Sequence, residues 1–481
     1  MKSIKRNLIY NAILKVTAVV FPLITAPYIS RVLEPDGLGL FNFATTYAGY
    51  FALVALLGIP QYGIRKVSAS RKDLSKLQDV VSELMTLSFL VTAGVCLVYF
   101  ATLFFIGEFR ENYLIFLVAG IALYLAPLKV EWFFSGMEEY GFITLRAIII
   151  RTLSIVAMFL FVKTKSDLII YVGISALSTV LTDVWNLTKM YKLGVRPHFK
   201  VKGIKKHLHP VLLLFSASIA ISVYTVLDTV MLGFMSDYSQ VGYYSSTSHL
   251  SKTLLALVTS LSVVAMPRMS YYKEEGNNKE LNNLANKSLL FVSFFAIPMV
   301  IGIICLSPTF VPLFFGDKFY EAIIPLQIIC LLIVAIGMNN ITGVQILVAL
   351  GYDKQFLYSV LTGTVCNFTM NMLLIPKLGA VGAAIASVTA EFLILFVTAI
   401  FVKKNTDIRF NQLSDIVKSL IGSIILIPIF LLLNLAINGW LLVVVFPIVG
   451  GLFYIAVQAI MKHTSYKLFI GTVKNTLKIR K

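Results

Sequence analysis

A lysine in the middle of an apolar segment is the first residue whose type and position suggest chemistry. Lys252 lies about eleven residues from either end of the apolar segment 241–265, too deep for its ammonium group to reach water easily. On a helix it shares one face with Ser245 and His249, because these residues are three, four or seven positions apart. Two interpretations follow: a cationic site for an anionic substrate, or a lysine paired with a structural carboxylate.

Two carboxylates also lie within apolar segments, and each could bind a coupling cation. Asp228 is toward the outer end of segment 211–234, and Glu391 is at mid-depth in segment 380–402. Asp228 could bind a coupling cation, pair with Lys252 or be a solvated helix end. Glu391 could sense protons or sodium ions, since a buried carboxylate is costly to keep charged, or make a structural hydrogen bond.

Three further cations complete the predicted anion-binding set with Lys252 and His249. Lys15 is close enough to the cytoplasmic surface either to extend to it or to line a cavity. Arg146 and Arg151 flank the start of segment 142–162, where a phosphate-positioning role competes with a purely topological one.

Amide and hydroxyl groups on other segments suit the hydroxyls of a sugar. The predicted sugar-facing residues are Ser245, Asn339, Gln345 and Asn367. Buried amides also join helices through hydrogen bonds, and for the three amides this is the simpler interpretation.

No catalytic, metal-binding or cofactor-binding motif accompanies these residues. The sequence contains no P-loop, no HExxH and no GxSxG, so we predict a protein that is not an enzyme, with no cofactor and no metal. Glu34 and Asp36 occupy the first outer loop, a place where membrane glycosyltransferases carry acidic residues. Glu34-Pro35-Asp36-Gly37 is more typical of a turn, because Pro, Asp and Gly are turn residues.

The elements that must position these residues are transmembrane helices. Hydrophobic residues make up 58% of the 481 residues and charged residues 13%, against about 25% charged residues in soluble domains. The mean hydropathy is +0.86. We therefore predict an all-α integral membrane protein with about 14 transmembrane helices. The predicted spans are 8–30, 40–60, 81–106, 113–131, 142–162, 167–188, 211–234, 241–265, 288–314, 322–348, 355–375, 380–402, 416–437 and 440–461.

The distribution of positive charge orients these helices. With the N-terminus inside, 32 of the 41 Lys and Arg residues fall in inner connections and 6 in outer ones. This asymmetry predicts a multi-pass protein of the cytoplasmic membrane with both termini cytoplasmic. It also accounts for the net charge of +18, so we predict no nucleic-acid partner.

A weak internal repeat suggests two similar halves. Gly39 and Phe41 recur as Gly242 and Tyr244, 203 residues later, each pair following an odd-numbered helix. We predict an N-terminal lobe at 1–210 (helices 1–6 and a cytoplasmic linker) and a second lobe at 211–402 (helices 7–12). Residues 403–481 would form two C-terminal helices and a basic cytoplasmic tail.

The segment at the end of the first helix resembles a known family. Pro27-Tyr28-Ile29-Ser30-Arg31-Val32-Leu33-Glu34-Pro35-Asp36-Gly37-Leu38-Gly39 is similar to the pattern Pro-Tyr-x-x-Arg-x-Leu-Gly-x-x-Gly-x-Gly of the Wzx-type polysaccharide-repeat-unit flippases. These belong to the multidrug/oligosaccharidyl-lipid/polysaccharide exporter superfamily. Glu34 departs from the pattern, which usually has glycine there. Further matches are Val241-Gly242-Tyr243-Tyr244, Pro267-Arg268-Met269-Ser270 and Leu378-Gly379-Ala380-Val381-Gly382-Ala383-Ala384.

The resemblance implies two six- or seven-helix lobes around a central cavity that work by alternating access. It implies a flippase for undecaprenyl-pyrophosphate-linked oligosaccharides that build capsule, exopolysaccharide, O-antigen or teichoic acid. Lys252 and Lys15 would then attract the pyrophosphate. The implied partners are this lipid-linked substrate, membrane lipids, and glycosyltransferases and a polymerase of the same pathway. The alternatives are a cation-coupled multidrug exporter or a lipid II flippase of the same superfamily.

Overall fold

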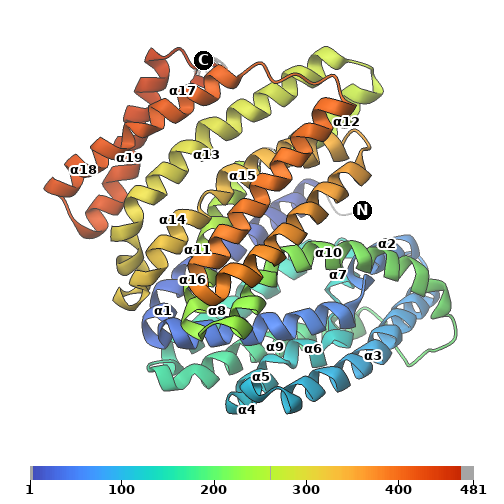
Figure 1. The fold of residues 1–481 in the computed structure, drawn as a ribbon. Coiled ribbons are helices and arrows are strands. Elements are labelled where there is room, and N and C mark those ends of the chain that lie inside the picture. The colour runs from blue at the N-terminus through green and yellow to red at the C-terminus, as the bar shows by residue number, and fades with distance from the viewer. Residues whose placement is uncertain (1–3, 261, 467–481) are drawn as a thin grey trace. The chain divides into compact units, whose positions relative to one another are not determined.

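The computed structural model describes residues 4–260 and 262–466, and the regular secondary structure of this part of the chain is entirely helical (Figure 1). The chain divides into two compact units, residues 1–233 (unit 1) and 234–481 (unit 2). This confirms the all-α class that the composition predicted. We describe each unit by itself.

Unit 1 contains the first ten α-helices and two short 3₁₀ helices. They are α1 (Ile4–Leu56), α2 (Ile59–Ser70), α3 (Leu74–Phe105), α4 (Gly107–Glu111), α5 (Tyr113–Ala119), α6 (Ile121–Tyr124), η1 (Ala126–Leu128), α7 (Glu131–Gly136), α8 (Tyr140–Phe161), η2 (Lys165–Asp167), α9 (Leu168–Lys192) and α10 (Lys205–Met235), whose last two residues belong to unit 2.

The long helices of unit 1 pack side by side, with α1 against both α3 and α8, and α8 against α9. Just after α3, an aromatic cluster fills the space between α1, α4 and α5. The ring of Phe109 lies 4.4 Å from that of Phe116 and 4.9 Å from that of Tyr47, in tilted arrangements that aromatic pairs favour. This cluster fixes the short helices that follow α3.

Helix α1 is interrupted at Glu34, where the predicted turn lies. Its φ of 60° and ψ of 174° belong to a backbone region that is essentially restricted to glycine. Pro35 then starts the second half of the helix, a position that proline tolerates well. The helix therefore resumes at once, and the gap of nine residues that the sequence suggested between the first two spans is helical.

The connection between α9 and α10 is fastened to α2 and α3 by a buried polar cluster. In the first turn of α10, His207 donates from Nε2 to Glu83 Oε2 at 2.8 Å, and its Nδ1 lies 2.8 Å from Tyr62 Oη. Lys206 forms an ion pair with Glu83 at 2.7 Å. Gly233, at the other end of α10, lies against the ring of Phe43. These contacts explain why most of α10 belongs to unit 1. The sequence repeat had instead suggested that a second lobe starts at residue 211.

Unit 2 contains the remaining helices. They are α11 (Tyr238–Thr259), α12 (Ser262–Glu274), α13 (Asn278–Phe315), η3 (Asp317–Ala322), α14 (Ile323–Ile329), α15 (Leu332–Asn339), η4 (Asn340–Val348), α16 (Asp353–Asn405), α17 (Leu413–Ile424), α18 (Leu426–Ala436) and α19 (Gly439–Ile460).

Helices α13 and α16 organise unit 2. Helix α13 packs against α15, α17 and α19, and α16 packs against α14, α15 and the π-helix η4. Helix α16 is broken at Gly379, whose φ of 53° and ψ of −127° no side chain adopts readily. There the side chain of Gln240 accepts a hydrogen bond of 2.9 Å from the backbone N–H of Ala380, which would otherwise lack a partner at the break.

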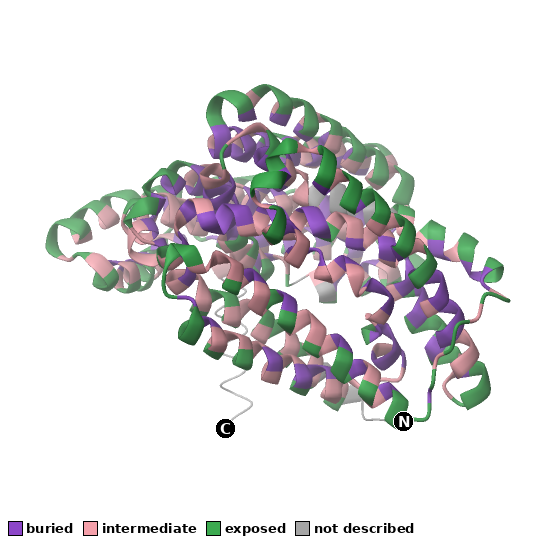
Figure 2. Cartoon of the chain, turned by 90° about the horizontal axis from the view of Figure 1, so that it is seen from below, coloured by how far each residue is buried: buried purple, intermediate pink, exposed green. Residues whose placement is uncertain are grey.

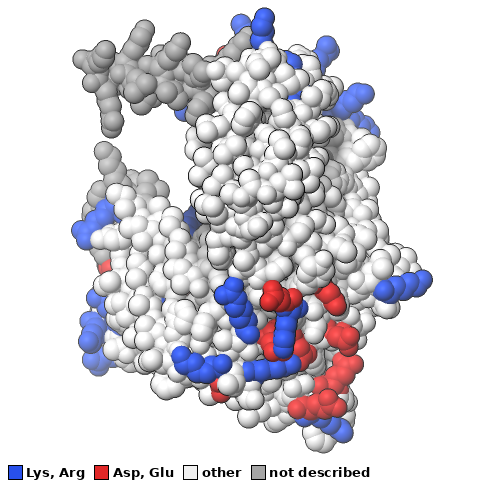
Figure 3. Space-filling view, turned by 90° about the vertical axis from the view of Figure 1, so that its left-hand side faces the viewer, with Lys and Arg blue, Asp and Glu red and all other residues white. Residues whose placement is uncertain are grey.

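The surfaces of both units suit a lipid environment. Large apolar side chains point outward, for example Leu97 with 73% of its surface exposed, Phe105 with 76% and Leu435 with 86%. Individual helices carry exposed residues on one side and buried residues on the other (Figure 2). Much of the face seen in Figure 3 carries no Lys, Arg, Asp or Glu. Such a surface would be a liability in water and is what a bilayer requires.

Within the described residues, nine helical segments are long and apolar enough to span a membrane, or ten if α11 and α12 form one bent span. Two of the nine contain the breaks at Glu34 and Gly379. Each of the fourteen predicted spans falls on helical chain. A multi-pass membrane protein is confirmed, while the number fourteen stays a prediction.

Candidate functional site

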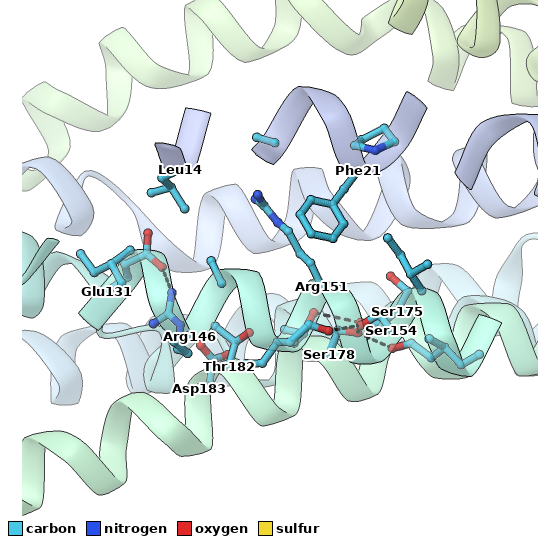
Figure 4. A pocket seen from close by; sticks show the side chains of 18 of the residues that line it. Leu14, Phe21, Glu131, Arg146, Arg151, Ser154, Ser175, Ser178, Thr182 and Asp183 are labelled. Carbon is cyan, nitrogen blue, oxygen red and sulfur yellow. Dashed lines mark hydrogen bonds and ion pairs between the residues drawn. The ribbon is translucent and has the colours of Figure 1, made fainter. Parts of the chain in front are cut away.

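A polar cavity in unit 1 collects charged side chains from four helical segments. It has a volume of about 890 Å³ and lies between α1, α8 and α9, with the start of α7 at one end (Figure 4). Apolar residues such as Phe21 and Ile150 form much of its wall. The charged residues that line it are Lys15, Lys129, Glu131, Arg146, Arg151 and Asp183.

Arg146 is the most buried cation of this cavity, with 3% of its side chain exposed. One Nη atom donates to Asn186 Oδ1 on α9 and the other to Glu131 Oε2 at the start of α7. The guanidinium group also lies over the ring of Phe142, whose centroid is 5.8 Å from the guanidinium carbon of Arg146. A buried guanidinium is tolerated only when it is paired and hydrogen-bonded, so these contacts hold Arg146 at a fixed place in the wall.

Arg151 and Lys15 present their charges with more freedom. Arg151 is half-buried on α8 and donates from Nη1 to Thr17 Oγ1 on α1 at 3.1 Å. In Figure 4 its side chain extends away from α8 toward α1, beside Phe21. Lys15 is exposed on α1 and lines the same cavity. The structure thus brings together three cations that the sequence had assigned to phosphate contact: Lys15, Arg146 and Arg151.

Sequence reasoning missed Lys129, Glu131 and Asp183. Asp183 has 4% of its surface exposed and interacts electrostatically with Lys129, Arg146 and Glu131. Its position inside the predicted span 167–188 is the same signal that singled out Asp228 and Glu391, so it could have been found.

Helix α9 also presents a polar stripe to this cavity, which the sequence reasoning overlooked. Ser175, Ser178, Thr179 and Thr182 are spaced by three and four residues and all line the cavity. Ser178 and Ser154 of α8 share a hydrogen bond (Figure 4). Hydroxyl groups at helical spacing beside the cations therefore offer neutral donors and acceptors to whatever the cations bind.

In unit 2, the residues predicted around Lys252 do not share one environment. Ser245 is buried and donates to the carbonyl oxygen of Gly242 at 3.4 Å. His249 and Lys252, one and two turns further along α11, are exposed on the surface of unit 2. The predicted face is therefore buried at its start and open at its middle.

The predicted amides and Glu391 lie in the interior of unit 2. Asn339 Nδ2 donates to Glu391 Oε2 at 3.4 Å, and Thr398 Oγ1 donates to Asn339 Oδ1 at 3.4 Å. Gln345, with 1% of its surface exposed, donates to Ser262 Oγ at 2.7 Å. Asn367, with 3% exposed, accepts from the neighbouring Asn371 at 3.2 Å. The contacts of Asn339 and Gln345 join different helices, as the alternative interpretation had it, whereas Asn367 and Asn371 both lie on α16.

Asp228 belongs to unit 1 and is buried on α10, with 5% of its surface exposed. It interacts electrostatically with Tyr50 of α1. This burial argues against a solvated helix end, which is one of the three interpretations of Asp228.

Unit 2 contains a second cavity of different character. It has a volume of about 540 Å³ and is lined by α11, α13, α18 and α19, almost entirely with apolar side chains. Phe294, Phe446 and Leu426 line it, together with Gly450 and Gly451, whose missing side chains widen it. Such a lining suits a hydrocarbon chain.

Two family models match this sequence. The model described as "Polysaccharide biosynthesis protein" matches residues 4–273, and the model MatE matches residues 214–373. Among curated proteins, the chain is 24% identical to a candidate O-antigen transporter of Escherichia coli K12, over 84% of this chain and 97% of that protein. It is 21% identical to the capsular polysaccharide biosynthesis protein CapF of Staphylococcus aureus, over 78% of this chain and 93% of that protein.

Solved structures with the same fold include two kinds of transporter. The lipid II flippase MurJ in an inward closed conformation matches with a TM-score of 0.78 at 17% identity, covering 96% of this chain and all of MurJ. An inward-facing multidrug resistance MATE family transporter of the MOP superfamily matches with a TM-score of 0.63 at 15% identity, over 80% of this chain and 93% of that one. At these identities the likeness establishes the fold and no more.

Proposed function

Because the chain belongs to the polysaccharide biosynthesis protein family, we propose that it is a flippase for undecaprenyl-pyrophosphate-linked oligosaccharides. The observation that carries this proposal is the cavity of unit 1, which is lined by four cations, Lys15, Lys129, Arg146 and Arg151, and by only two carboxylates. Buried cations are costly in a membrane and are retained where they meet an anion. Guanidinium groups in particular match the oxygens of a phosphate.

The three parts of such a substrate find matching chemistry. The pyrophosphate would bind the cations of the unit 1 cavity, and the first sugar would meet the hydroxyl stripe of α9. The polyprenyl chain requires an apolar surface, which the outward-facing apolar side chains of unit 1 offer, Leu97 and Phe105 among them. The names of the curated relatives, an O-antigen transporter and a capsular polysaccharide biosynthesis protein, support a polysaccharide precursor as cargo.

We also assign roles to the site residues that were predicted from the sequence outside this cavity. Lys252 and His249, exposed on unit 2, would provide a separate cationic contact for an anionic lipid. Ser245, Asn339, Gln345 and Asn367 would meet sugars only after giving up the hydrogen bonds that they make within unit 2. Asp228 and Glu391 would bind a coupling ion. Transport would proceed from the inner to the outer leaflet by alternating access of two lobes, with both termini cytoplasmic. Glycosyltransferases and a polymerase of the same pathway would supply and consume the cargo.

The multidrug exporter is the alternative of different class, and the same cavity argues against it. A cavity that carries four cations and two carboxylates repels cationic compounds more than it attracts them. A lipid II flippase remains compatible with the cavity, because lipid II also carries a pyrophosphate.

Reconstitution into liposomes tests the proposed function. A fluorescent undecaprenyl-pyrophosphate-linked oligosaccharide in the vesicle membrane should move between leaflets in a protein-dependent way, followed by quenching with a membrane-impermeant reductant. Efflux of cationic dyes from the same vesicles should be absent. Dye efflux without movement of the lipid-linked sugar would overturn the proposal in favour of a multidrug exporter.

A further inference from the structure

The cavity of unit 1 contains its own anion next to its most buried cation. Glu131 is the first residue of α7, and its carboxylate accepts a hydrogen bond from Arg146 (Figure 4). The two partners differ greatly in burial: 52% of the Glu131 side chain is exposed and 3% of the Arg146 side chain. Glu131 can therefore leave this contact by moving into open space, whereas Arg146 cannot.

Polar atoms around the same guanidinium lack hydrogen-bond partners. In the described part of the chain these are Nε of Arg146, Nδ2 of Asn186 and Oδ2 of Asp183. Asn186 has none of its surface exposed and Asp183 has 4%. A buried polar atom without a partner is costly, and Nε of Arg146 and Nδ2 of Asn186 are both donors, so an anionic acceptor that reached them would lower the free energy.

The charges of the cavity match a doubly charged ligand. Four cationic and two anionic side chains line it, so its formal charge is +2. A pyrophosphate diester carries two negative charges, while the phosphodiester of a bulk phospholipid carries one. The charge of the cavity alone therefore favours the dianion over the bulk lipid.

We propose that Glu131 is an exchangeable counter-anion of Arg146, which the pyrophosphate of the substrate displaces when it binds. In the absence of substrate its carboxylate occupies Arg146, and a ligand must displace it to reach the guanidinium. A pyrophosphate can compensate for the lost ion pair through contacts with Arg151 and Lys129 as well, whereas a single phosphodiester has fewer oxygens and half the charge to do so. On release, Glu131 returns and displaces the product. This inference rests on the proposed function, because it concerns the same cavity.

The test compares two glutamates that differ in position and resemble each other in contacts. Glu131→Gln removes the counter-anion. Glu138→Gln is the matched control, because Glu138 is also paired with an arginine, Arg71 at 2.7 Å, and neither residue lines the cavity. Binding of inorganic pyrophosphate and inorganic phosphate to the full-length protein in detergent would be measured by calorimetry for each variant.

We expect Glu131→Gln to bind both anions more tightly than the wild type, pyrophosphate by roughly tenfold, because neither anion then has to displace a carboxylate from Arg146. Glu138→Gln should match the wild type for both anions. In the liposome assay, Glu131→Gln should lower both KM and kcat, because tighter binding slows release. A purely structural role of Glu131 would not lower KM. Glu131→Asp retains the charge on a shorter arm and should give intermediate affinities, which keeps the test informative if the Gln variant folds poorly.

The outcomes separate this inference from the proposed function. Equal pyrophosphate affinity in the wild type and Glu131→Gln, with both proteins folded, would overturn the counter-anion role and leave the flippase intact. If wild type and variants alike fail to bind pyrophosphate, the headgroup site itself is wrong.

Discussion

Replacing Arg151 with glutamine should weaken anion binding to the cavity while leaving the protein folded. Arg151 is half-buried, and its hydrogen bond to Thr17 spans 3.1 Å. Loss of such a bond costs about 1 kcal/mol of stability, which a folded membrane protein tolerates. Arg146, by contrast, is buried with two partners, and its removal would disturb the wall of the cavity.

The effect on anion binding should be larger than the effect on folding. A hydrogen bond between a charged donor and a phosphate oxygen contributes about 1.5–3 kcal/mol, which corresponds to roughly 10- to 150-fold in affinity. We therefore expect Arg151→Gln to weaken binding of inorganic pyrophosphate by roughly 30-fold. The KM of the liposome assay should rise with it.

The assay needs a control that removes the same charge elsewhere. Arg110 is exposed on α4, and its Nε donates to the carbonyl oxygen of Phe104 at 3.0 Å. Arg110→Gln should leave pyrophosphate affinity unchanged. An Arg151→Gln protein that unfolds at the wild-type temperature and binds pyrophosphate as tightly as the wild type would refute the assignment of this cavity to the headgroup.

Three further predictions concern the fold. Glu34→Gly should raise the unfolding temperature, because it removes backbone strain of about 1–3 kcal/mol, whereas Glu34→Ala keeps the strain and should not; equal shifts would contradict the strain. Gly63→Ala should cost about 1–3 kcal/mol, because its new Cβ would overlap the indole of Trp132, while Gly94→Ala, with no atom within 4 Å of that Cβ, should be neutral or slightly stabilising. Burial lowers the pKa of His463, so the unfolded chain binds more protons than the folded chain below about pH 6.5, and stability falls as the pH drops through this value. His463→Asn should flatten the dependence of the unfolding temperature on pH between about pH 8 and about pH 5.5, and an unchanged slope would show that another group is responsible.

The helices and their membrane environment could be predicted from the sequence because they depend on local hydropathy. Each predicted span falls on helical chain, and the turn residues at Glu34-Pro35 mark a real break in α1. The break at Gly379 also lies between two predicted spans. The local sequence pattern could not show that the helix continues directly from Pro35. It does so because a single strained residue, Glu34, takes the place of a longer turn.

The cavity of unit 1 was only partly predictable. Lys15, Arg146 and Arg151 were chosen individually, but their convergence depends on how α1 packs against α8, which no spacing along the chain reveals. Glu131 escaped notice because it lies at the edge of a predicted span, where charges are ordinary. Asp183 could have been found, since it is a carboxylate inside an apolar segment and ends a stripe of hydroxyl residues with helical spacing.

The environment of Lys252 shows the limit of periodicity as a guide. Residues spaced by three and four positions share a side of α11, yet Ser245 is buried in unit 2 and Lys252 is exposed. The reason is that neighbouring helices cover only part of the length of α11. Spacing along the sequence therefore predicts which side of a helix is polar, but tertiary packing decides which part of that side is accessible.

The most direct test of the account is a cryo-electron microscopy structure of the protein with a bound undecaprenyl-pyrophosphate-linked disaccharide. The account predicts density for the pyrophosphate in the cavity of unit 1, within hydrogen-bonding distance of Arg146 and Arg151, with the carboxylate of Glu131 moved away from Arg146. A pyrophosphate bound at Lys252 and His249, with the Glu131–Arg146 contact unchanged, would contradict it.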